Sequence, residues 1–364
     1  MNAGNKFKLR LSSDTGIHKF NYNGYKYDKV GLTRGINDNN NDELFISLGY
    51  RILTHKWRKE PFAASHFLRV NYSLTQTSFS IEYKSIFTQL IGKADLVLFA
   101  DYDQERNYHY TGLGNNTKLI SPDKNFFRTR FREFLGSIGL ERRIGAEHNL
   151  GIHVFYEGVK VLTDTGKFIS PNPASFFDKD NFYGVKANYN FKKVNNKIFP
   201  SSGFAFGIDG GYTKNADMSD RSFVKGGLMI GFYVPVLPSL TLAIKAAGAT
   251  LEGDAEFYQL PRLGGGSTMR GFRRYRFFGK SAFSNQNELQ FNFNMRSCLL
   301  NGKVGLLGLL DNGRVWLPGE TSDEWHVGVG GGLMIAPFNK ISITGTYTKS
   351  KEEARFNVRI GSLF

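Results

Sequence analysis

Long stretches of the chain alternate between apolar and polar residues with a period of two. The clearest case is residues 288–295, where four apolar side chains alternate with four polar ones: Leu289, Phe291, Phe293 and Met295 against Glu288, Gln290, Asn292 and Asn294. Residues 68–74 and 341–348 repeat the pattern. Successive side chains of a β-strand point to opposite faces. The alternation therefore predicts strands that each have one apolar and one polar face.

The pattern predicts sixteen strands. They lie near residues 26–36, 42–52, 64–74, 78–87, 94–103, 126–140, 147–159, 182–193, 202–213, 222–234, 239–250, 283–295, 302–312, 325–335, 340–348 and 354–364. An even number is usual for a single-chain bacterial barrel. The long connections at 104–125, 160–181 and 251–282 each follow an odd-numbered strand, so they are expected on one side, with short turns on the other.

Two architectures produce this alternation. A soluble sandwich turns its apolar faces inward, whereas a membrane barrel turns them outward and encloses a polar lumen. The segments approach the roughly 9–11 residues that cross a bilayer at a tilt. Their apolar faces carry aromatic residues near the ends, as membrane interfaces favour. We therefore expect an all-β fold, a transmembrane antiparallel β-barrel of about 16 strands, in the bacterial outer membrane.

Composition supports this fold over the helical alternative. Among 364 residues there are 41 glycines and 15% aromatic residues, and no long segment shows a helical period. The most apolar stretch, residues 227–251, contains Pro235 and Pro238 near its centre. Proline breaks a helix interior, so two strands joined by a turn at 235–238 are expected there.

Charge and cysteine content exclude several function classes. The formal charge is +15, but the basic residues are scattered and match no nucleic-acid-binding module. We interpret the excess as lumen and rim charge that meets anionic lipid. The lone Cys298 indicates a structural position. No histidine spacing suits a metal, and no nucleophile elbow is present. We expect no catalytic residues, no cofactor, no metal and no nucleic-acid partner.

The ends of the chain lead to further expectations. Residues 1–25 are polar and basic, without the apolar core of a signal peptide, and are expected to form a short periplasmic segment. Residues 26–364 are expected to form the barrel. Since export requires a signal, the sequence is expected to be a mature or truncated chain, or the C-terminal part of a longer one.

Four short motifs lie in order along the last 165 or so residues. Arg270, Gly271 and Phe272 follow the triple glycine 264–266, Asp311 and Gly313 form an Asp-x-Gly pattern, and residues 199–203 read Phe-Pro-Ser-Ser-Gly. The tail 356–364 ends in an aromatic residue. Together these motifs resemble the BamA/TamA/FhaC-type bacterial surface antigen superfamily of outer-membrane β-barrels.

The resemblance implies a site. In the family, the loop corresponding to 251–282 folds into the lumen, and its arginine pairs with wall carboxylates, which here are Asp311 and Glu288. Asp311 and Gly313 match the strand motif. The tail, with Phe356, Val358, Ile360 and Phe364 expected to face outward and Arg355, Asn357 and Arg359 inward, resembles the β-signal read by the barrel-assembly machinery. Arg273, Arg274 and Arg276 are open to two interpretations, an anion site or lumen and rim charge.

The resemblance also implies a function, the insertion or export of polypeptides across the outer membrane. Expected partners are outer-membrane lipid and lipopolysaccharide, the assembly machinery during biogenesis, and a polypeptide client. Residues 1–25 are too few for the transport-associated domains that normally precede such barrels. An alternative is therefore an anchor or translocation barrel for a fused or associated enzymatic domain. A second alternative is a diffusion porin plugged by its own loop.

Overall fold

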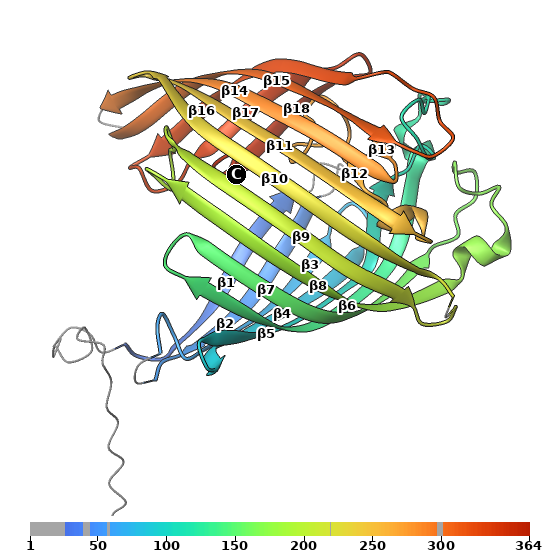
Figure 1. Ribbon diagram of the computed structural model, residues 1–364, viewed down its shortest axis with the longest axis horizontal. Helices are drawn as coiled ribbons and strands as arrows, with labels where there is room; N and C mark the ends of the chain where they lie inside the picture. Colours follow the sequence, from blue (N-terminus) through green and yellow to red (C-terminus); the bar gives the residue numbers. More distant parts are fainter. Residues whose placement is uncertain (1–25, 39–43, 57–58, 219, 297–300) are drawn as a thin grey trace, which may run out of the picture.

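A computed structural model describes residues 26–38, 44–56, 59–218, 220–296 and 301–364. It is an all-β structure whose main sheet contains sixteen antiparallel strands (Figure 1). These strands are β1 (Lys29–Asp38), β2 (Leu44–Thr54), β3 (Ala64–Ser73), β4 (Ser78–Ile91), β5 (Ala94–His109), β6 (Arg128–Ile144), β7 (His148–Val161), β8 (Lys179–Val194), β9 (Gly203–Asn215), β10 (Ser222–Leu237), β11 (Leu240–Gly253), β14 (Ser281–Arg296), β15 (Asn301–Trp316), β16 (His326–Pro337), β17 (Ile343–Lys349) and β18 (Ala354–Ile360). The predicted fold class and strand number are confirmed.

Each strand pairs with its neighbours in chain order, so the sheet begins at β1 and ends at β18. A second, two-stranded sheet lies outside this order and consists of β12 (Arg262–Leu263) and β13 (Phe277–Phe278). Three short 3-10 helices, Lys124–Phe127, Ala174–Phe177 and Phe257–Gln259, belong to the long connections. None of the helices in the described residues is long and apolar enough to cross a bilayer.

The strands are apolar outside and polar inside. In β14, Ser284, Gln286 and Glu288 are buried, whereas Leu289 and Phe291 are 46% and 45% exposed. Leu68 and Val70 of β3 are similarly exposed. A soluble core would bury these apolar side chains. The inverted arrangement is the one expected for a membrane barrel with a polar lumen.

The apolar segment 227–251 forms parts of β10 and β11. Its turn differs from the predicted one. Pro235 remains within β10, where the pairing register shifts between Pro235 and Leu237, and the chain reverses at residues 238–239. An interruption of the regular register suits a proline, which cannot donate a ladder hydrogen bond.

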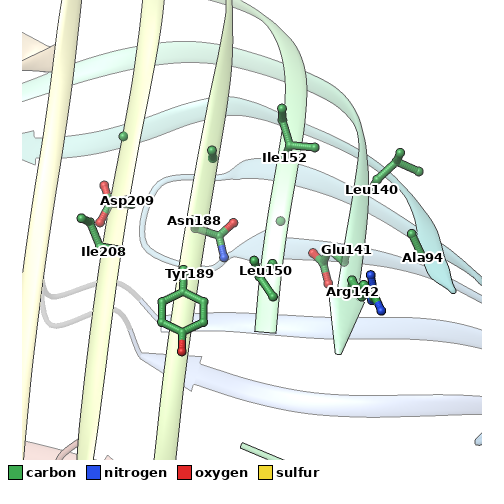
Figure 2. A pocket seen from close by; sticks show the side chains of 13 residues that line it. Ala94, Leu140, Glu141, Arg142, Leu150, Ile152, Asn188, Tyr189, Ile208 and Asp209 are labelled. Atoms are coloured by element: carbon green, nitrogen blue, oxygen red, sulfur yellow. The ribbon is translucent and has the colours of Figure 1, made fainter. Parts of the chain in front are cut away.

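The outer face of the sheet is hollowed across β6 to β9. The open depression has a volume of about 580 Å³ and is lined mainly by apolar residues of these strands, such as Leu140, Leu150, Ile152 and Ile208 (Figure 2). Arg142 borders it near the end of β6 that leads into the short turn 145–147.

The long connections close one end of the lumen. Their aromatic side chains pack with the inner faces of β5 to β8 in a cluster of buried residues: Tyr108, Phe131, Val159, Val161, Ile169, Phe182, Phe257 and Tyr258. Burial and the charge of Asp180, whose carboxylate accepts a hydrogen bond from the hydroxyl, raise the pKa of Tyr258. The connections therefore pack against the inner wall of β5 to β8 at this end of the barrel.

Candidate functional site: the lumen loop and the last strand

The connection between β11 and β14, residues 254–280, folds back against the inner wall, and we call it the lumen loop. Strands β12 and β13 pair within it and make it a hairpin. Gly264 lies at φ +114°, and a Cβ there would meet the Arg273 carbonyl oxygen at 2.0 Å. Only glycine permits both the backbone conformation and this close approach.

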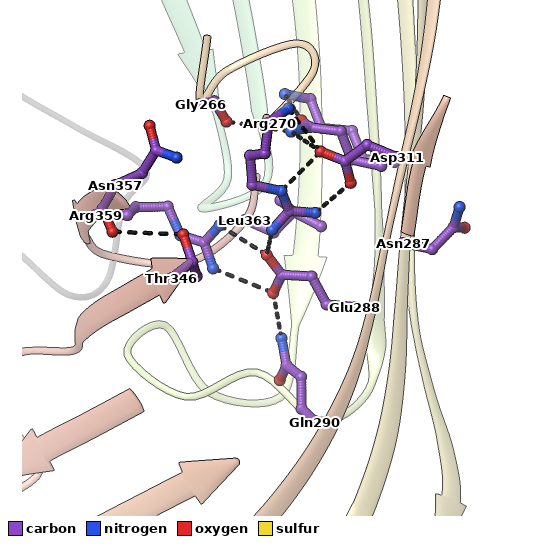
Figure 3. A network of polar contacts seen from close by, with 12 residues as sticks. Gly266, Arg270, Asn287, Glu288, Gln290, Asp311, Thr346, Asn357, Arg359 and Leu363 are labelled. Atoms are coloured by element: carbon purple, nitrogen blue, oxygen red, sulfur yellow. Dashed lines mark hydrogen bonds and ion pairs between the residues drawn. The ribbon is translucent and has the colours of Figure 1, made fainter. Parts of the chain in front are cut away.

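Arg270, at the tip of the lumen loop, contacts both carboxylates expected from the sequence. Its Nε and Nη2 donate to the Asp311 carboxylate at 2.7 and 2.5 Å, and its backbone N–H donates to Asp311 at 2.9 Å. Its Nη1 donates to Glu288 Oε1 at 2.5 Å (Figure 3). The arginine side chain is only 2% exposed. Burial alone would lower the pKa of Arg270, but the hydrogen bonds and charges of Asp311 and Glu288 outweigh it and raise the pKa. The side chain is therefore charged.

Glu288 has a second arginine partner that the sequence did not identify. Arg359 of β18 donates from Nη1 to Glu288 Oε1 at 2.8 Å and from Nη2 to Oε2 at 3.1 Å. Figure 3 shows the two guanidinium groups converging on this carboxylate. The alternation of the tail placed Arg359 on the polar face, but no sequence signal paired it with a residue 71 positions away. Glu288 thus joins the lumen loop to the last strand of the sheet.

Two glutamines and a lysine complete the network. Gln290 donates to the second Glu288 oxygen at 2.8 Å, and Gln286 donates to the Gly266 carbonyl at 3.1 Å. Lys245 of β11 donates to the Ser267 carbonyl at 2.8 Å. Buried charges are tolerated when their remaining hydrogen-bonding positions are satisfied. The wall of β11 and β14 therefore holds the loop by its backbone as well as by its arginine.

The other motif residues make room for the loop or pack beneath it. Gly271 lies at φ +90°, a left-handed conformation that favours glycine. A Cβ on Gly313 would meet the Phe283 carbonyl oxygen at 2.7 Å and the loop's Met269 sulfur at 3.4 Å. Phe272 is 1% exposed and packs with Leu263, Met269 and other apolar residues of one cluster. The loop is thus anchored by both packing and charge.

Gly328 of β16 offers a direct test of this close packing. A Cβ there would meet the Arg270 carbonyl oxygen at 2.1 Å, whereas a Cβ on Gly308 of β15 meets nothing nearer than Leu289 at 4.0 Å. Gly328→Ala is expected to displace the loop and to lower the free energy of unfolding by about 1–3 kcal/mol. It should also speed proteolysis within residues 254–280 at least fivefold. Gly308→Ala is the control. Equal cleavage of the two variants would show that the loop does not need this space.

A second ion pair fastens the other arm of the lumen loop. Arg276 is 1% exposed, and its Nε and Nη2 each donate to the Glu352 carboxylate at 2.8 Å. Its Nη1 also donates to the hydroxyls of Thr111 and Thr117. Arg273 lies 3.7 Å from Glu353. These arginines link the lumen loop to the short connection between β17 and β18 and, through Thr111 and Thr117, to the long connection after β5.

The tail agrees with the expected orientation only up to Ile360. Phe356, Val358 and Ile360 point outward and are 65%, 56% and 70% exposed. Phe364 was expected to face outward too, and this is wrong. Gly361 lies at φ +105°, after the last residue of β18, and the chain turns away from the outer face.

Phe364 instead packs on the inner side of β10. Its ring stacks on Tyr233 at 4.4 Å between centroids. The ring also occupies the space above Gly231, where a Cβ would meet it at 2.7 Å. The Leu363 N–H donates to the Tyr233 hydroxyl at 3.0 Å, and Lys192 donates to the Phe364 carbonyl oxygen at 2.6 Å. These partners explain the difference, because they satisfy groups that would otherwise lie at the sheet edge.

The expectations for the N-terminal segment and for the lone cysteine fall outside the described residues. Residues 1–25 and Cys298 do not belong to the described residues. Within the part of the chain that is described, no group of three or more side chains is arranged to hold a metal ion.

A sixteen-strand sheet that is apolar outside, polar inside and occupied by an ion-paired loop defines the class of outer-membrane β-barrels with a lumen loop. The family model for the Omp85 superfamily domain matches residues 63–364. The chain therefore belongs to the Omp85 superfamily, and its place is the bacterial outer membrane. No curated protein matches the sequence.

Solved structures share this fold at low sequence identity. BamA from Haemophilus ducreyi lacking POTRA domains 1-3 is 14% identical with a TM-score of 0.68, over 93% of this chain and 70% of that one. CdiB from Escherichia coli is 14% identical with a TM-score of 0.56, over 91% of this chain. CdiB from Acinetobacter baumannii is 11% identical with a TM-score of 0.54, over 92% of this chain. The chain spans 61% and 59% of the two CdiB chains.

Proposed function

We propose that the chain is an outer-membrane barrel that inserts or exports polypeptides, with the seam between β1 and β18 as the working edge and the lumen loop as the element that holds the lumen closed. Membership of the Omp85 superfamily supports the general class. The insertion or export of a client, the client itself and the role of the seam belong to the proposal. No catalytic step is part of it.

The observation that carries the proposal is the pair of sheet edges. Strands β1 and β18 are the two ends of the sixteen-strand order. Val30 and Leu32 of β1 are 61% and 63% exposed, and Val358 of β18 is 56% exposed. An edge strand presents backbone donors and acceptors that can pair with an incoming strand. The apolar outer faces of both edges would keep such a strand at the level of the lipid.

The lumen loop argues against a diffusion porin. Its arginines are buried in ion pairs, one with the wall strands β14 and β15 and one with the neighbouring connections. A porin keeps a water-filled channel, whereas here a loop is held inside the lumen by buried ion pairs.

Disulfides across the seam test the proposal. Cysteine pairs scanned along β1 and β18, in a Cys298→Ser background, are expected to abolish client insertion or export once oxidised, since β1 and β18 can no longer separate. Reduction should restore activity. The measurement is the amount of barrel proteins in the outer membrane and of polypeptides at the surface, in cells that depend on the variant.

The control is a disulfide that leaves the seam free. Tyr347 of β17 and Phe356 of β18 are direct partners in the register, so Tyr347→Cys with Phe356→Cys locks two strands on the same side of the seam. This variant should remain active. Full activity of the oxidised seam variants, or large steady currents of the wild type in planar bilayers, would contradict the proposal.

A further inference from the structure

Three basic residues form a continuous row on the outer face of β6, β7 and β8. The strand register pairs Arg132 with Lys160 and Lys160 with Lys179, and all three are exposed. Neighbouring strands lie about 4.8 Å apart, so the row spans roughly 10 Å. The side chain of Lys179 leans over β7, since a Cβ on Gly158 would meet its Cε at 3.3 Å and its Nζ at 3.7 Å.

The alternation of the strands places this row on the face that meets lipid. Arg132 is two residues from the outward-facing Phe134 on β6. Lys160 is four residues from Tyr156 on β7, and Lys179 is four residues from Tyr183 on β8. Residues an even number apart on a strand share a face. The three aromatic side chains are 41%, 42% and 46% exposed.

The same aromatic residues give the level of the row in the membrane. The rings of Phe134 and Tyr156 lie 6.3 Å apart, and the Tyr156 hydroxyl donates to Asn181 at 2.8 Å. Aromatic side chains with such polar partners gather at the membrane interface. The basic residues lie beyond them, at the ends of the strands that carry the long connections. Long connections mark the outer side of such a barrel, so the row lies among the head groups of the outer leaflet.

The row is poorly neutralised by the protein itself. No ion pair joins Arg132, Lys160 or Lys179 to a carboxylate in the described residues, whereas the nearby Arg130 pairs with Glu105 and Asp164. Lys214, the register partner of Tyr183, adds a further positive charge. Glu133 and Asp180, next in the chain to Arg132 and Lys179, lie on the opposite, lumen face, where Glu133 pairs with Arg106 and Asp180 accepts a hydrogen bond from Tyr258. On the side of the row, Asp178 precedes Lys179, and Asp217 accepts hydrogen bonds from Asn181. The surface keeps a net positive charge.

We propose that Arg132, Lys160 and Lys179 form a binding site for the phosphate groups of a phosphorylated glycolipid of the outer leaflet. Lysine and arginine bind phosphate by charge-assisted hydrogen bonds. Three cations over about 10 Å match a head group with two phosphates on joined sugars better than a phospholipid with one. The acyl chains would lie on the apolar outer face below the aromatic residues. The site is independent of the polypeptide-handling function proposed above.

The test compares two pairs of substitutions in the full chain, folded in detergent. Lys160→Gln with Lys179→Gln removes two charges of the row. Each basic residue near a membrane surface contributes about 1 kcal/mol to binding anionic lipid, so the affinity for bisphosphorylated lipid A should fall about 30-fold. Native mass spectrometry or titration with a fluorescent lipid A measures this loss.

The control pair is Arg142→Gln with Lys193→Gln. These two residues also lie on the outer face of β6 and β8 but at the opposite ends of the strands, where Arg142 borders the depression in Figure 2. The control should bind lipid A within twofold of the wild type. An equal loss in both pairs would overturn the site. Equally tight binding of phosphatidylglycerol to the wild type would overturn the choice of a glycolipid.

Discussion

Replacing Arg270 by alanine is expected to release the lumen loop and to lower the free energy of unfolding by about 3–5 kcal/mol. The guanidinium is 2% exposed and lies between Asp311 and Glu288. Without it, Asp311 keeps only neutral donors among the described residues, the backbone N–H of residue 270 at 2.9 Å and the Gln286 amide at 3.4 Å, so a buried negative charge loses the positive charge that compensates it. The temperature at which the folded barrel loses its characteristic electrophoretic mobility, and the rate of proteolysis within 254–280, measure the effect.

Two further substitutions separate charge from geometry. Arg274→Ala removes an arginine of the same loop that makes no ion pair in the described residues and whose guanidinium donates to the hydroxyl of the neighbouring Tyr275 and lies over its ring. It should leave both measurements nearly unchanged. Arg270→Lys keeps the charge but loses the planar fork that reaches both carboxylates, so an intermediate effect is expected. An Arg270→Ala variant that melts and resists protease like the wild type would show that these ion pairs do not hold the loop.

Glu288→Gln is expected to loosen both the lumen loop and the last strand. The carboxylate is fully buried and receives hydrogen bonds from Arg270 and Arg359. The amide keeps the shape but removes the charge that both guanidinium groups share, at a cost on the order of 3 kcal/mol. Faster hydrogen exchange in β18, together with faster cleavage of the loop, is the expected signature.

The control for this variant is Glu82→Gln. Glu82 pairs with Arg69 on the wall between β3 and β4, but these side chains are 23% and 36% exposed, and such solvated pairs contribute about 1 kcal/mol or less. A double-mutant cycle completes the test: Arg359→Gln should destabilise the wild type more than the Glu288→Gln variant. If the two effects are equal, Arg359 and Glu288 are not energetically coupled.

A shared carboxylate has a consequence for the proposed function. The lumen loop and β18 are attached to the same point of the wall, so a movement of one changes the electrostatic environment of the other. If β18 moves away from β14 when the seam opens, Glu288 loses Arg359 but keeps its ion pair with Arg270, and the lumen loop stays attached to the wall. A client strand that drew β18 away from β14 would therefore have to break the ion pair between Arg359 and Glu288.

The fold could be predicted from the sequence because strand alternation is a local property. Residues 288–295 carry both faces of β14 in eight consecutive positions, and such a pattern needs no tertiary contact to be recognised. The same reasoning placed Glu288 and Arg359 on the lumen side. The partners of Arg270 came from a resemblance in motif order, since spacing along the chain does not show which wall residues a loop reaches.

Three features were decided by the tertiary structure. Pro235 stays within β10, at a point where the pairing with β11 shifts in register. Arg359 of β18 meets Glu288 of β14 because both side chains point into the lumen, where Arg270 of the loop contacts the same carboxylate. Phe364 turns inward because Tyr233, Gly231 and Lys192, distant in sequence, form a place for it.

The sequence by itself determined which residues form strands and which side of each strand meets lipid, because the alternation of apolar and polar side chains involves only neighbouring residues. Only the tertiary structure decided which lumen side chains meet, since contacts across a barrel join positions with no local relation. The ion pairs of Arg270 with Asp311 and of Glu288 with Arg359 both belong to that second kind.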